Sequence, residues 1–281
     1  MTPSVITEPA PAKLNLALHV RHRRPDGYHE LETLFAFCRD GDLIELAPAD
    51  ANAFAIAGPF ADALRGPNAW TDNLVIRAAD AFAAKFGIDR AHRITLTKNL
   101  PIASGIGGGS ADAAATLRAL ARLHGVAPDD ADLRAVAARL GADVPACLLG
   151  RTALGRGRGD ALRPLAGLAG TPVLLVNPGV PLSTAQVFAG WDGTDRGPIG
   201  EGDLLAVTLA GRNDLEPAAR ALAPAIDGVL ALLRAGTGVL LARMSGSGAT
   251  CFALFEDGAA RAAAAERAGA RGWWCLETAL A

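Results

Sequence analysis

The sequence has little of what a secreted, membrane-spanning or nucleic-acid-binding protein requires. Its 281 residues include only four cysteines and one tyrosine, and its formal net charge is −2. The cysteines are isolated from one another and no pair has the spacing of metal ligands, which predicts buried thiols in a reducing compartment. No apolar run is long enough to span a bilayer, and the first residues lack the basic and apolar regions of a secretory signal. We therefore expect a cytoplasmic protein without a membrane partner, and the dispersed basic residues argue against nucleic acid.

What is present indicates an ordinary globular chain with a sizeable core. Hydrophobic residues make up 51% of the sequence and charged residues 20%. A chain of this length and composition is expected to form two domains. We place the boundary after Asp160, which gives domains over residues 1–160 and 161–281.

A glycine cluster that runs directly into an alanine-rich helical pattern is the most informative segment. It spans residues 101–115 and reads Pro-Ile-Ala-Ser-Gly-Ile-Gly-Gly-Gly-Ser-Ala-Asp-Ala-Ala-Ala. Glycines let backbone N–H groups approach an oxyanion closely, and a following helix adds unpaired N–H donors and the positive end of its dipole. The spacing fits neither a Walker loop nor a Rossmann fingerprint. The segment therefore predicts a different kind of nucleotide-phosphate cradle, and the alternative is a flexible turn that caps a helix.

Hydrophobic periodicity predicts mixed helices and strands in the first half. In residues 12–20, leucines and a valine alternate with Lys13, Asn15 and other residues, which is the period of a half-buried strand and places Lys13 and Asn15 on one face. Further strands are expected over 42–46 and 93–98, and helices over 73–86, 109–124 and 129–140.

The second half reads as a split βαβ arrangement. Strands are expected over 172–176, 239–244, 250–255 and 273–277, with helices near 184–190, around 214–233 and between the last two strands. This order is similar to a ferredoxin-like layout. The whole chain is therefore predicted to be an α+β protein.

Three side chains have the chemistry that phosphoryl transfer needs. Lys13 offers a cation on a defined strand face, Ser110 offers a hydroxyl at the cradle, and Asp143 offers a carboxylate that accepts a proton. A lone lysine or aspartate is more often a surface residue. Convergence of the three stays open at this point.

Three motifs in order resemble the signature motifs of the GHMP kinases. They are Pro11–Leu16, the glycine segment Pro101–Ala111 and Met244–Gly248. The resemblance implies a two-domain fold with a ferredoxin-like C-terminal domain and ATP as phosphate donor. Residues 26–31, 141–145 and 213–216 look like the hallmarks of those members that phosphorylate a cytidine-diphosphate-bearing alcohol in non-mevalonate isoprenoid synthesis.

The resemblance also implies roles for residues at the acceptor. Asp143 would act as general base, while Lys13 would orient the acceptor hydroxyl and stabilise charge, with Asn15 in support. Tyr28 and His29 are similar to a cytidine-recognition pair, one ring stacking on the base and the other bonding its edge. Two further positions complete the acceptor side, with Phe188 as a second aromatic wall and Thr184 near the substrate. The alternative for Tyr28 and Phe188 is ordinary packing of a loop and a helix.

On the donor side, the resemblance assigns the glycine segment to the ATP phosphates. The implied contacts are Pro101, Ser104, Gly105, Gly107, Gly108, Gly109 and Ser110. Asn73, Leu74 and Lys98 are expected near the nucleoside. Mg²⁺ should accompany ATP, with Ser110 as the expected protein contact. The sequence departs from the family pattern at two positions: Ala111 stands where a second hydroxyl residue is common, and Asp160 stands where glutamate is common.

Two other functions remain open from the sequence. One is a GHMP kinase that acts on another small alcohol of the homoserine or mevalonate type, for which Tyr28, His29 and Phe188 would have no clear purpose. The other is a nucleotide-binding sensor without catalysis, which would be free to lose Lys13 and Asp143. The chain is expected to be a monomer or a homodimer.

Overall fold

The computed structural model describes residues 5–64 and 72–281, and contacts divide the chain into two compact units. Unit 1 comprises Met1–Ala12, Asp40–Ile102 and Gly107–Gly150, and unit 2 comprises Lys13–Arg39, Ala103–Ile106 and Arg151–Ala281. Each unit is assembled from separate stretches of chain, so neither coincides with a single sequence segment. The expected domain boundary between residues 160 and 161 stays a prediction.

Two long strands, β1 (Ile6–Arg23) and β2 (His29–Pro48), pair with each other and contribute residues to both units. The alternating pattern predicted only the middle of β1, and it predicted 42–46 as a separate short strand. Both strands are longer because a hydrogen-bonded ladder continues where the apolar alternation has stopped. In unit 1, β2 pairs antiparallel with β4 (His92–Thr97), and β3 (Ala53–Ala57) runs parallel to β4.

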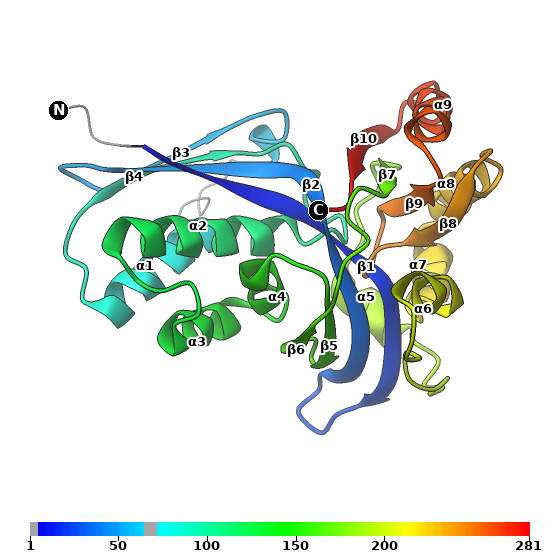
Figure 1. Cartoon of the computed structure of the whole chain (residues 1–281), viewed down its shortest axis with the longest axis horizontal. Coiled ribbons are helices and arrows are strands. Elements are labelled where there is room, and N and C mark those ends of the chain that lie inside the picture. The colour runs from blue at the N-terminus through cyan, green and yellow to red at the C-terminus, as the bar shows by residue number, and fades with distance from the viewer. Residues whose placement is uncertain (1–4, 65–71) are drawn as a thin grey trace. The chain divides into compact units, whose positions relative to one another are not determined.

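Unit 1 also contains the four helices α1 to α4, which pack against one another (Figure 1). Their bounds are Leu74–Phe86 for α1, Gly108–His124 for α2, Ala131–Leu140 for α3 and Val144–Leu149 for α4. The side chain of Asn73 caps α1 by accepting a hydrogen bond from Val75 N at 2.9 Å, and Asp130 caps α3 in the same way. All six alanines of α2 are buried, which allows close packing against α1. The three predicted helices begin and end within two residues of those observed, whereas α4 and β3 were not predicted.

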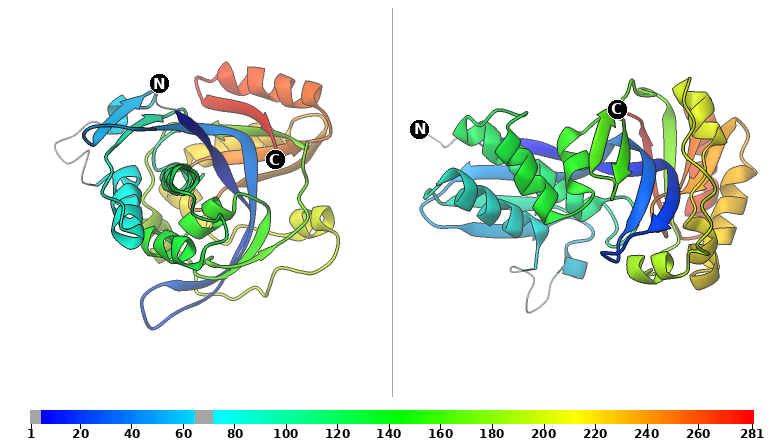
Figure 2. Two further views of the ribbon diagram at one scale, coloured as in Figure 1. Left: turned by 60° about the vertical axis from the view of Figure 1, so that its left-hand side comes forward. Right: turned by 90° about the horizontal axis from the view of Figure 1, so that it is seen from below.

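Unit 2 is built on an antiparallel four-stranded sheet with the order β10-β7-β9-β8. The strands are β7 (Pro172–Asn177), β8 (Val239–Met244), β9 (Cys251–Phe255) and β10 (Trp274–Ala279). Helix α8 (Ala225–Arg234) packs on β8 and β9, and α9 (Gly258–Gly269) packs on β7, β9 and β10 (Figure 2). This order confirms the ferredoxin-like prediction.

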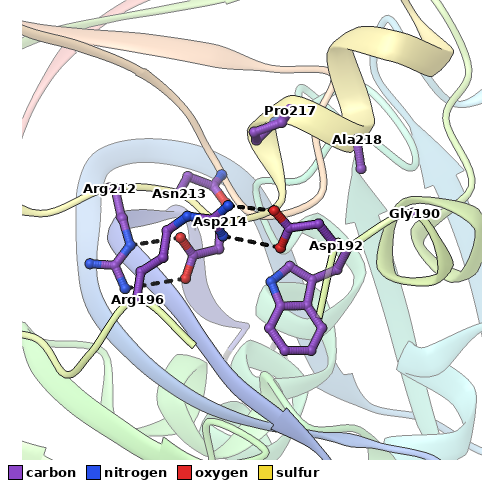
Figure 3. A pocket seen from close by; sticks show the side chains of 9 residues that line it. Gly190, Asp192, Arg196, Arg212, Asn213, Asp214, Pro217 and Ala218 are labelled. Atoms are coloured by element: carbon purple, nitrogen blue, oxygen red, sulfur yellow. Dashed lines mark hydrogen bonds and ion pairs between the residues drawn. The ribbon is translucent and has the colours of Figure 1, made fainter. Parts of the chain in front are cut away.

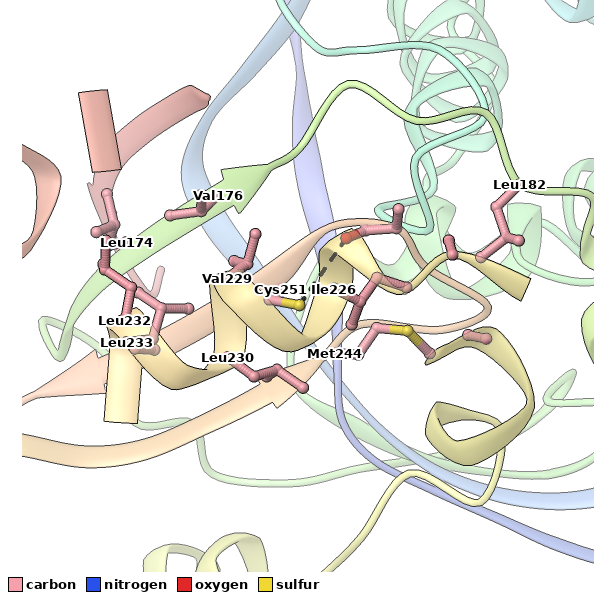
Figure 4. Close-up of a cluster of buried hydrophobic side chains, with 14 of the residues drawn as sticks. Leu174, Val176, Leu182, Ile226, Val229, Leu230, Leu232, Leu233, Met244 and Cys251 are labelled. Carbon is pink, nitrogen blue, oxygen red and sulfur yellow. Dashed lines mark hydrogen bonds between the residues drawn. The ribbon is translucent and has the colours of Figure 1, made fainter. Parts of the chain in front are cut away.

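The core of unit 2 lies between this sheet and the helices that pack on it (Figure 4). Leu174 and Val176 of β7 face Val229 and Leu233 of α8, and all four side chains are buried. Leu174 and Val176 are two residues apart and so share one face of the strand, and Val229 and Leu233 are four residues apart and so share one face of the helix. The core therefore fixes the sheet from which the third glycine motif projects.

Five further helices and strands belong to unit 2, and α5 among them carries Thr184 and Phe188. They are the hairpin β5 (Ala153–Gly157) and β6 (Ala161–Pro164), and the helices α5 (Thr184–Ala189), α6 (Leu204–Ala210) and α7 (Glu216–Leu222). Strand β5 pairs with β2, with Leu31 opposite Gly157. Of the helices within the described ranges, none has the length and apolar character needed to cross a membrane.

Candidate active site

Lys13 and Asn15 lie side by side on β1, as the alternation predicts, and their side chains are linked. Lys13 Nζ donates to Asn15 Oδ1 at 2.8 Å, and Asn15 Nδ2 donates to Thr33 Oγ1 of β2 at 2.7 Å. The Thr33 hydroxyl donates in turn to the Ala17 carbonyl at 2.9 Å. All three side chains are buried. The network fixes the amide of Asn15 so that its oxygen faces the lysine, which holds the ammonium group in one place.

Two glycine-containing motifs meet at this strand within unit 2. Ser245 Oγ accepts a hydrogen bond from Asn15 N at 3.2 Å and donates to the carbonyl of Gly105 at 3.0 Å. Lys13 N also donates to Ile106 O at 2.9 Å. Gly105 has φ +78°, and a Cβ at this position would lie 2.5 Å from Ser245 O, so only glycine fits. The three predicted motifs are therefore brought together around the backbone of residues 105 and 106.

The segment Asn213–Glu216, which sequence analysis used only as a family hallmark, supports the third motif. Asn213 Nδ2 donates to the carbonyls of Met244 and Gly246, both at 2.8 Å. Glu216 Oε2 accepts from Met244 N at 3.2 Å. Both side chains thus hold the backbone of the turn that presents Ser245. No sequence signal identified this role, because the two segments are about thirty residues apart and neither has a distinctive period.

An aromatic cluster contains two of the predicted acceptor residues and one that was not predicted. The His29 ring lies 5.0 Å from the ring centroid of Phe188 on α5, and 5.7 Å from Trp191 in an edge-to-face arrangement. Burial lowers the pKa of His29, and the positive charge of Arg23 lowers it further. A neutral imidazole both donates and accepts hydrogen bonds, which suits recognition of the polar edge of a base. Sequence analysis missed Trp191.

Tyr28, the neighbour of His29, lies on the exposed turn between β1 and β2. Its side chain is 54% exposed, and the guanidinium of Arg158 lies over its ring at 5.2 Å from the centroid. Thr184, at the start of α5, shares a hydrogen bond of 2.9 Å with Ser247 of the third motif. The predicted acceptor residues of unit 2 therefore occupy β1, the β1–β2 turn, the start of β2 and α5.

The predicted phosphate cradle continues into unit 1 at the start of α2. Gly107 occupies the N-cap position with φ 67°. Because glycine has no side chain to cap the helix, the first N–H groups of α2 are available to an external anion. Gly108, Gly109 and Ser110 form the first turn, and their side chains or Cα atoms are partly or fully exposed. This geometry fits a phosphate ligand.

Lys98, expected near the nucleoside, lies in a buried ion cluster of unit 1. Its Nζ donates to Asp42 Oδ2 at 2.5 Å and to Asp112 Oδ2 at 2.7 Å. A Cβ on Gly108 would lie 3.0 Å from this ammonium, so the cluster sits directly under the first turn of α2. Burial raises the pKa of Asp112 to about 7 despite the opposing charge of Lys98. Burial also disfavours the ammonium, but the two carboxylates outweigh it and raise the pKa of Lys98.

The other predicted residues of unit 1 lie at the ends of helices. Asp143 holds the N-cap position of α4, where its carbonyl accepts from Cys147 N at 3.0 Å, and its side chain is partly exposed. Asn73 uses its side chain to cap α1, and Leu74 is the first residue of that helix. Within residues 5–64 and 72–281, no group of three or more His, Cys, Asp or Glu side chains is arranged as a metal site. The meeting of Asp143 with Lys13, which belongs to unit 2, stays a prediction.

A cavity of about 210 Å³ in unit 2 is lined in part by Asn213 and Asp214, and by no residue of the three signature motifs (Figure 3). Its charged side chains are paired with one another: Asp192 with Arg196, and Asp214 with Arg212 at 2.7 Å. Because these charges neutralise each other, the lining offers no unbalanced charge to a diphosphate.

Comparison with known proteins gives matches over the whole chain. Residues 73–151 match the model of the GHMP kinases N terminal domain, and residues 202–272 match that of the GHMP kinases C terminal region. A protein of Rhizorhabdus wittichii named 4-diphosphocytidyl-2-C-methyl-D-erythritol kinase is 55% identical over 98% of this chain and 94% of its own length. A protein of the same name from Novosphingobium aromaticivorans is 50% identical over 98% and 93%.

Two solved structures match this chain over nearly its whole length. A crystal structure of 4-(cytidine 5'-diphospho)-2C-methyl-D-erythritol kinase has 37% identity and a TM-score of 0.81, and covers 98% of this chain and 99% of its own. A homoserine kinase from Cytophaga hutchinsonii has a TM-score of 0.73 at 22% identity, covering 100% and 96%, which is a similarity of fold alone.

Proposed function

Since the chain belongs to the 4-diphosphocytidyl-2-C-methyl-D-erythritol kinase family of the GHMP kinases, we propose that it phosphorylates the 2-hydroxyl of 4-diphosphocytidyl-2-C-methyl-D-erythritol with ATP. The predicted α+β fold with a ferredoxin-like C-terminal part is confirmed, and so is a phosphotransferase that uses ATP. The sensor alternative is therefore wrong. The homoserine and mevalonate types share only the fold at 22% identity or less.

The observation that carries the proposal is the hydrogen-bonded junction of Lys13, Asn15, Gly105 and Ser245. A cation fixed by an amide beside a glycine-rich backbone is what transfer of a phosphoryl group needs, because the reaction depends on positioning and on stabilising charge. We assign Lys13 to orient the acceptor hydroxyl and to stabilise the transferred group. Asn15 supports the lysine through its 2.8 Å hydrogen bond. Asp143 is the proposed acceptor of the hydroxyl proton.

The ATP phosphates are proposed to bind the glycine segment. Gly105, Gly107, Gly108 and Gly109 would present backbone N–H groups to the phosphate oxygens, with Pro101, Ser104 and Ser110 in the same loop. Asn73, Leu74 and Lys98 would lie near the nucleoside. Mg²⁺ would be held through phosphate oxygens, water and Ser110, where it would neutralise charge on the phosphates.

Recognition of the acceptor is proposed to use the rings around the β1–β2 turn. Cytosine would stack on Tyr28 and Phe188, while the neutral His29 bonds its polar edge and Thr184 lies near the substrate. Action in the cytoplasm, as a monomer or homodimer and without a nucleic-acid partner, belongs to the same proposal.

The test is ADP release from ATP and Mg²⁺ with four acceptors in parallel. We expect turnover with 4-diphosphocytidyl-2-C-methyl-D-erythritol, and only background release with homoserine, mevalonate and galactose. Turnover with one of the other alcohols instead would overturn the acceptor assignment while leaving the kinase fold. A preparation that releases ADP with none of the four would overturn the reaction itself.

A further inference from the structure

Arg158 occupies a place that neither the motifs nor the proposed function accounts for. It lies at the tip of the β5–β6 hairpin, and its guanidinium carbon is 5.2 Å from the centroid of the Tyr28 ring. A planar ring has two faces, and this contact covers one of them. Tyr28 as a residue is 54% exposed, so the contact with Arg158 leaves part of it accessible to a ligand.

The guanidinium is not a freely moving surface charge. Its Nε and Nη2 both donate to Asp160 Oδ2, at 3.1 and 2.8 Å, and its backbone N donates to Asp160 Oδ1 at 3.2 Å. Gly157 and Gly159, on either side, have φ +74° and +96°, so they form the tight tip that brings Asp160 back to the arginine. Arginine suits this arrangement because one planar group pairs with a carboxylate and stacks on a ring.

The hairpin tip is also attached to the turn that carries Tyr28. Glu30 Oε1 accepts a hydrogen bond from Gly157 N at 3.1 Å, and Glu30 Oε2 accepts from Arg24 Nη1 at 3.3 Å. Tyr28 is held on the same turn, because its N donates to Asp26 Oδ1 at 3.1 Å. The arginine and the tyrosine are therefore presented to each other by two connected pieces of backbone.

We propose that Arg158 is a positioning residue that fixes the Tyr28 ring for stacking with the cytosine of the acceptor, an inference that rests on the proposed function. The ring of a half-exposed tyrosine on a turn is otherwise free to change rotamer, and binding must then order it. A cation stacked on one face holds the ring in place and leaves the opposite face for the base. Asp160 is part of the device because it orients the guanidinium.

The test is a double-mutant cycle between Arg158→Met and Tyr28→Ala, measured as KM for the cytidine substrate, KM for ATP and kcat. We expect Arg158→Met to raise KM for the cytidine substrate roughly two- to fivefold, the size of an exposed cation–π contact, with the other two constants unchanged. Tyr28→Ala should raise KM for the cytidine substrate about tenfold or more. In the Tyr28→Ala background, Arg158→Met should have no further effect.

The cycle separates this role from direct binding of the diphosphate. If Arg158→Met weakens the substrate by the same factor in both backgrounds, the arginine acts on the substrate itself and the positioning role is overturned. An unchanged KM in Arg158→Met also overturns it, while the effect of Tyr28→Ala would still support the proposed stacking. If Tyr28→Ala leaves KM for the cytidine substrate unchanged, both the positioning role of Arg158 and the proposed stacking on Tyr28 are overturned. Arg163→Met, on the exposed part of the same hairpin, is the matched control.

A readout independent of activity is available because Tyr28 is the only tyrosine of the chain. In protein labelled on tyrosine, the NMR signals of one ring report the contact directly. We expect Arg158→Met to shift these signals in the protein without substrate, and Arg163→Met to leave them in place. Unshifted signals in Arg158→Met would show that the ring does not stack on the arginine in solution, which overturns the inference.

Discussion

The buried ion cluster of Lys98, Asp42 and Asp112 leads to a prediction about thermal stability. One ammonium lies between two carboxylates, and the side chains of Lys98, Asp42 and Asp112 are only 3%, 0% and 4% exposed. Lys98→Met keeps most of the apolar stem of the side chain, one atom shorter, but removes its charge. Asp42 and Asp112 would then face each other without a cation, so one of them must take up a proton or remain an unpaired buried charge, and breaking a buried pair in this way costs about 3–5 kcal/mol.

The loss is large enough to measure by thermal unfolding. For a chain of this size each kcal/mol lowers Tm by about 2–4 °C, so Lys98→Met should melt roughly 10 °C below the parent protein at pH 7. Lys85→Met is the control, because Lys85 pairs with Asp132 at 2.8 Å but the two side chains are 36% and 55% exposed. An exposed pair contributes about 0–1 kcal/mol. The control should therefore melt within a few degrees of the parent.

A second variant tests the electrostatic cause. Asp42 Oδ1 accepts from the backbone N of Asn99 and Leu100, at 2.6 and 2.8 Å, and is still bonded when the lysine is absent. Asp112 Oδ1 is buried and has no hydrogen-bond partner among the described residues. Lys98→Met combined with Asp112→Leu should therefore regain part of the lost Tm. If Lys98→Met melts like Lys85→Met, or if the double variant is worse than the single one, the reasoning is refuted.

Four further predictions concern other parts of the molecule. Asp143→Asn should lower kcat roughly 100- to 10,000-fold while calorimetry finds ATP binding intact, and near-normal turnover would exclude the role as base. The Nε2 atoms of His92 and His124 lie 2.9 Å apart, and burial lowers the pKa of both side chains below 6.5. Their contribution to stability is therefore present above pH 6.5 and is lost as the pH falls. His124→Phe should flatten the fall in Tm between pH 7 and 5, and an unchanged slope would contradict this. Gly105→Ala should raise KM for ATP and lower Tm, since its Cβ would lie 2.5 Å from a carbonyl oxygen, and a variant equal to the parent would show that the loop is elsewhere in solution. Burial raises the pKa of the Cys251 thiol, so this thiol should react with Ellman's reagent only on unfolding, and rapid reaction in native protein would disprove its burial.

Local patterns were sufficient to predict most helices and the order of the ferredoxin-like part. The start of α1 follows from Asn73, which caps the helix, and the end of α2 follows from Gly125 with φ 70°. These signals act within four residues of the position that they specify, so a single sequence carries them. The lengths of β1 and β2 do not depend on local pattern, because each residue added to a strand is stabilised by a partner strand.

Contacts between distant segments could not be predicted in the same way. The role expected for Lys98 near the nucleoside rests on the family resemblance and stays a prediction, whereas its partners in the structure, Asp42 and Asp112, are 56 and 14 residues away and could not be read from a local pattern. Asp42 was considered only as the start of a strand. Trp191 and Arg158 were missed for the same reason, since each acts through a ring at positions 28 or 29 that is far away in sequence.

Asn213, in the segment Asn213–Glu216, lies outside the proposed catalytic residues but is expected to affect the reaction through hydrogen bonds. Asn213 bonds the carbonyls of Met244 and Gly246, and thereby holds the turn in which Ser245 lies. Ser245 in turn accepts from the backbone N of Asn15, whose side chain fixes the ammonium of Lys13. Loss of the Asn213 amide therefore leaves two buried carbonyls without a donor and loosens the proposed catalytic lysine through two intermediates. A residue three hydrogen-bonded steps from the reacting atoms is thus expected to affect kcat as well as stability, because position decides the rate of phosphoryl transfer.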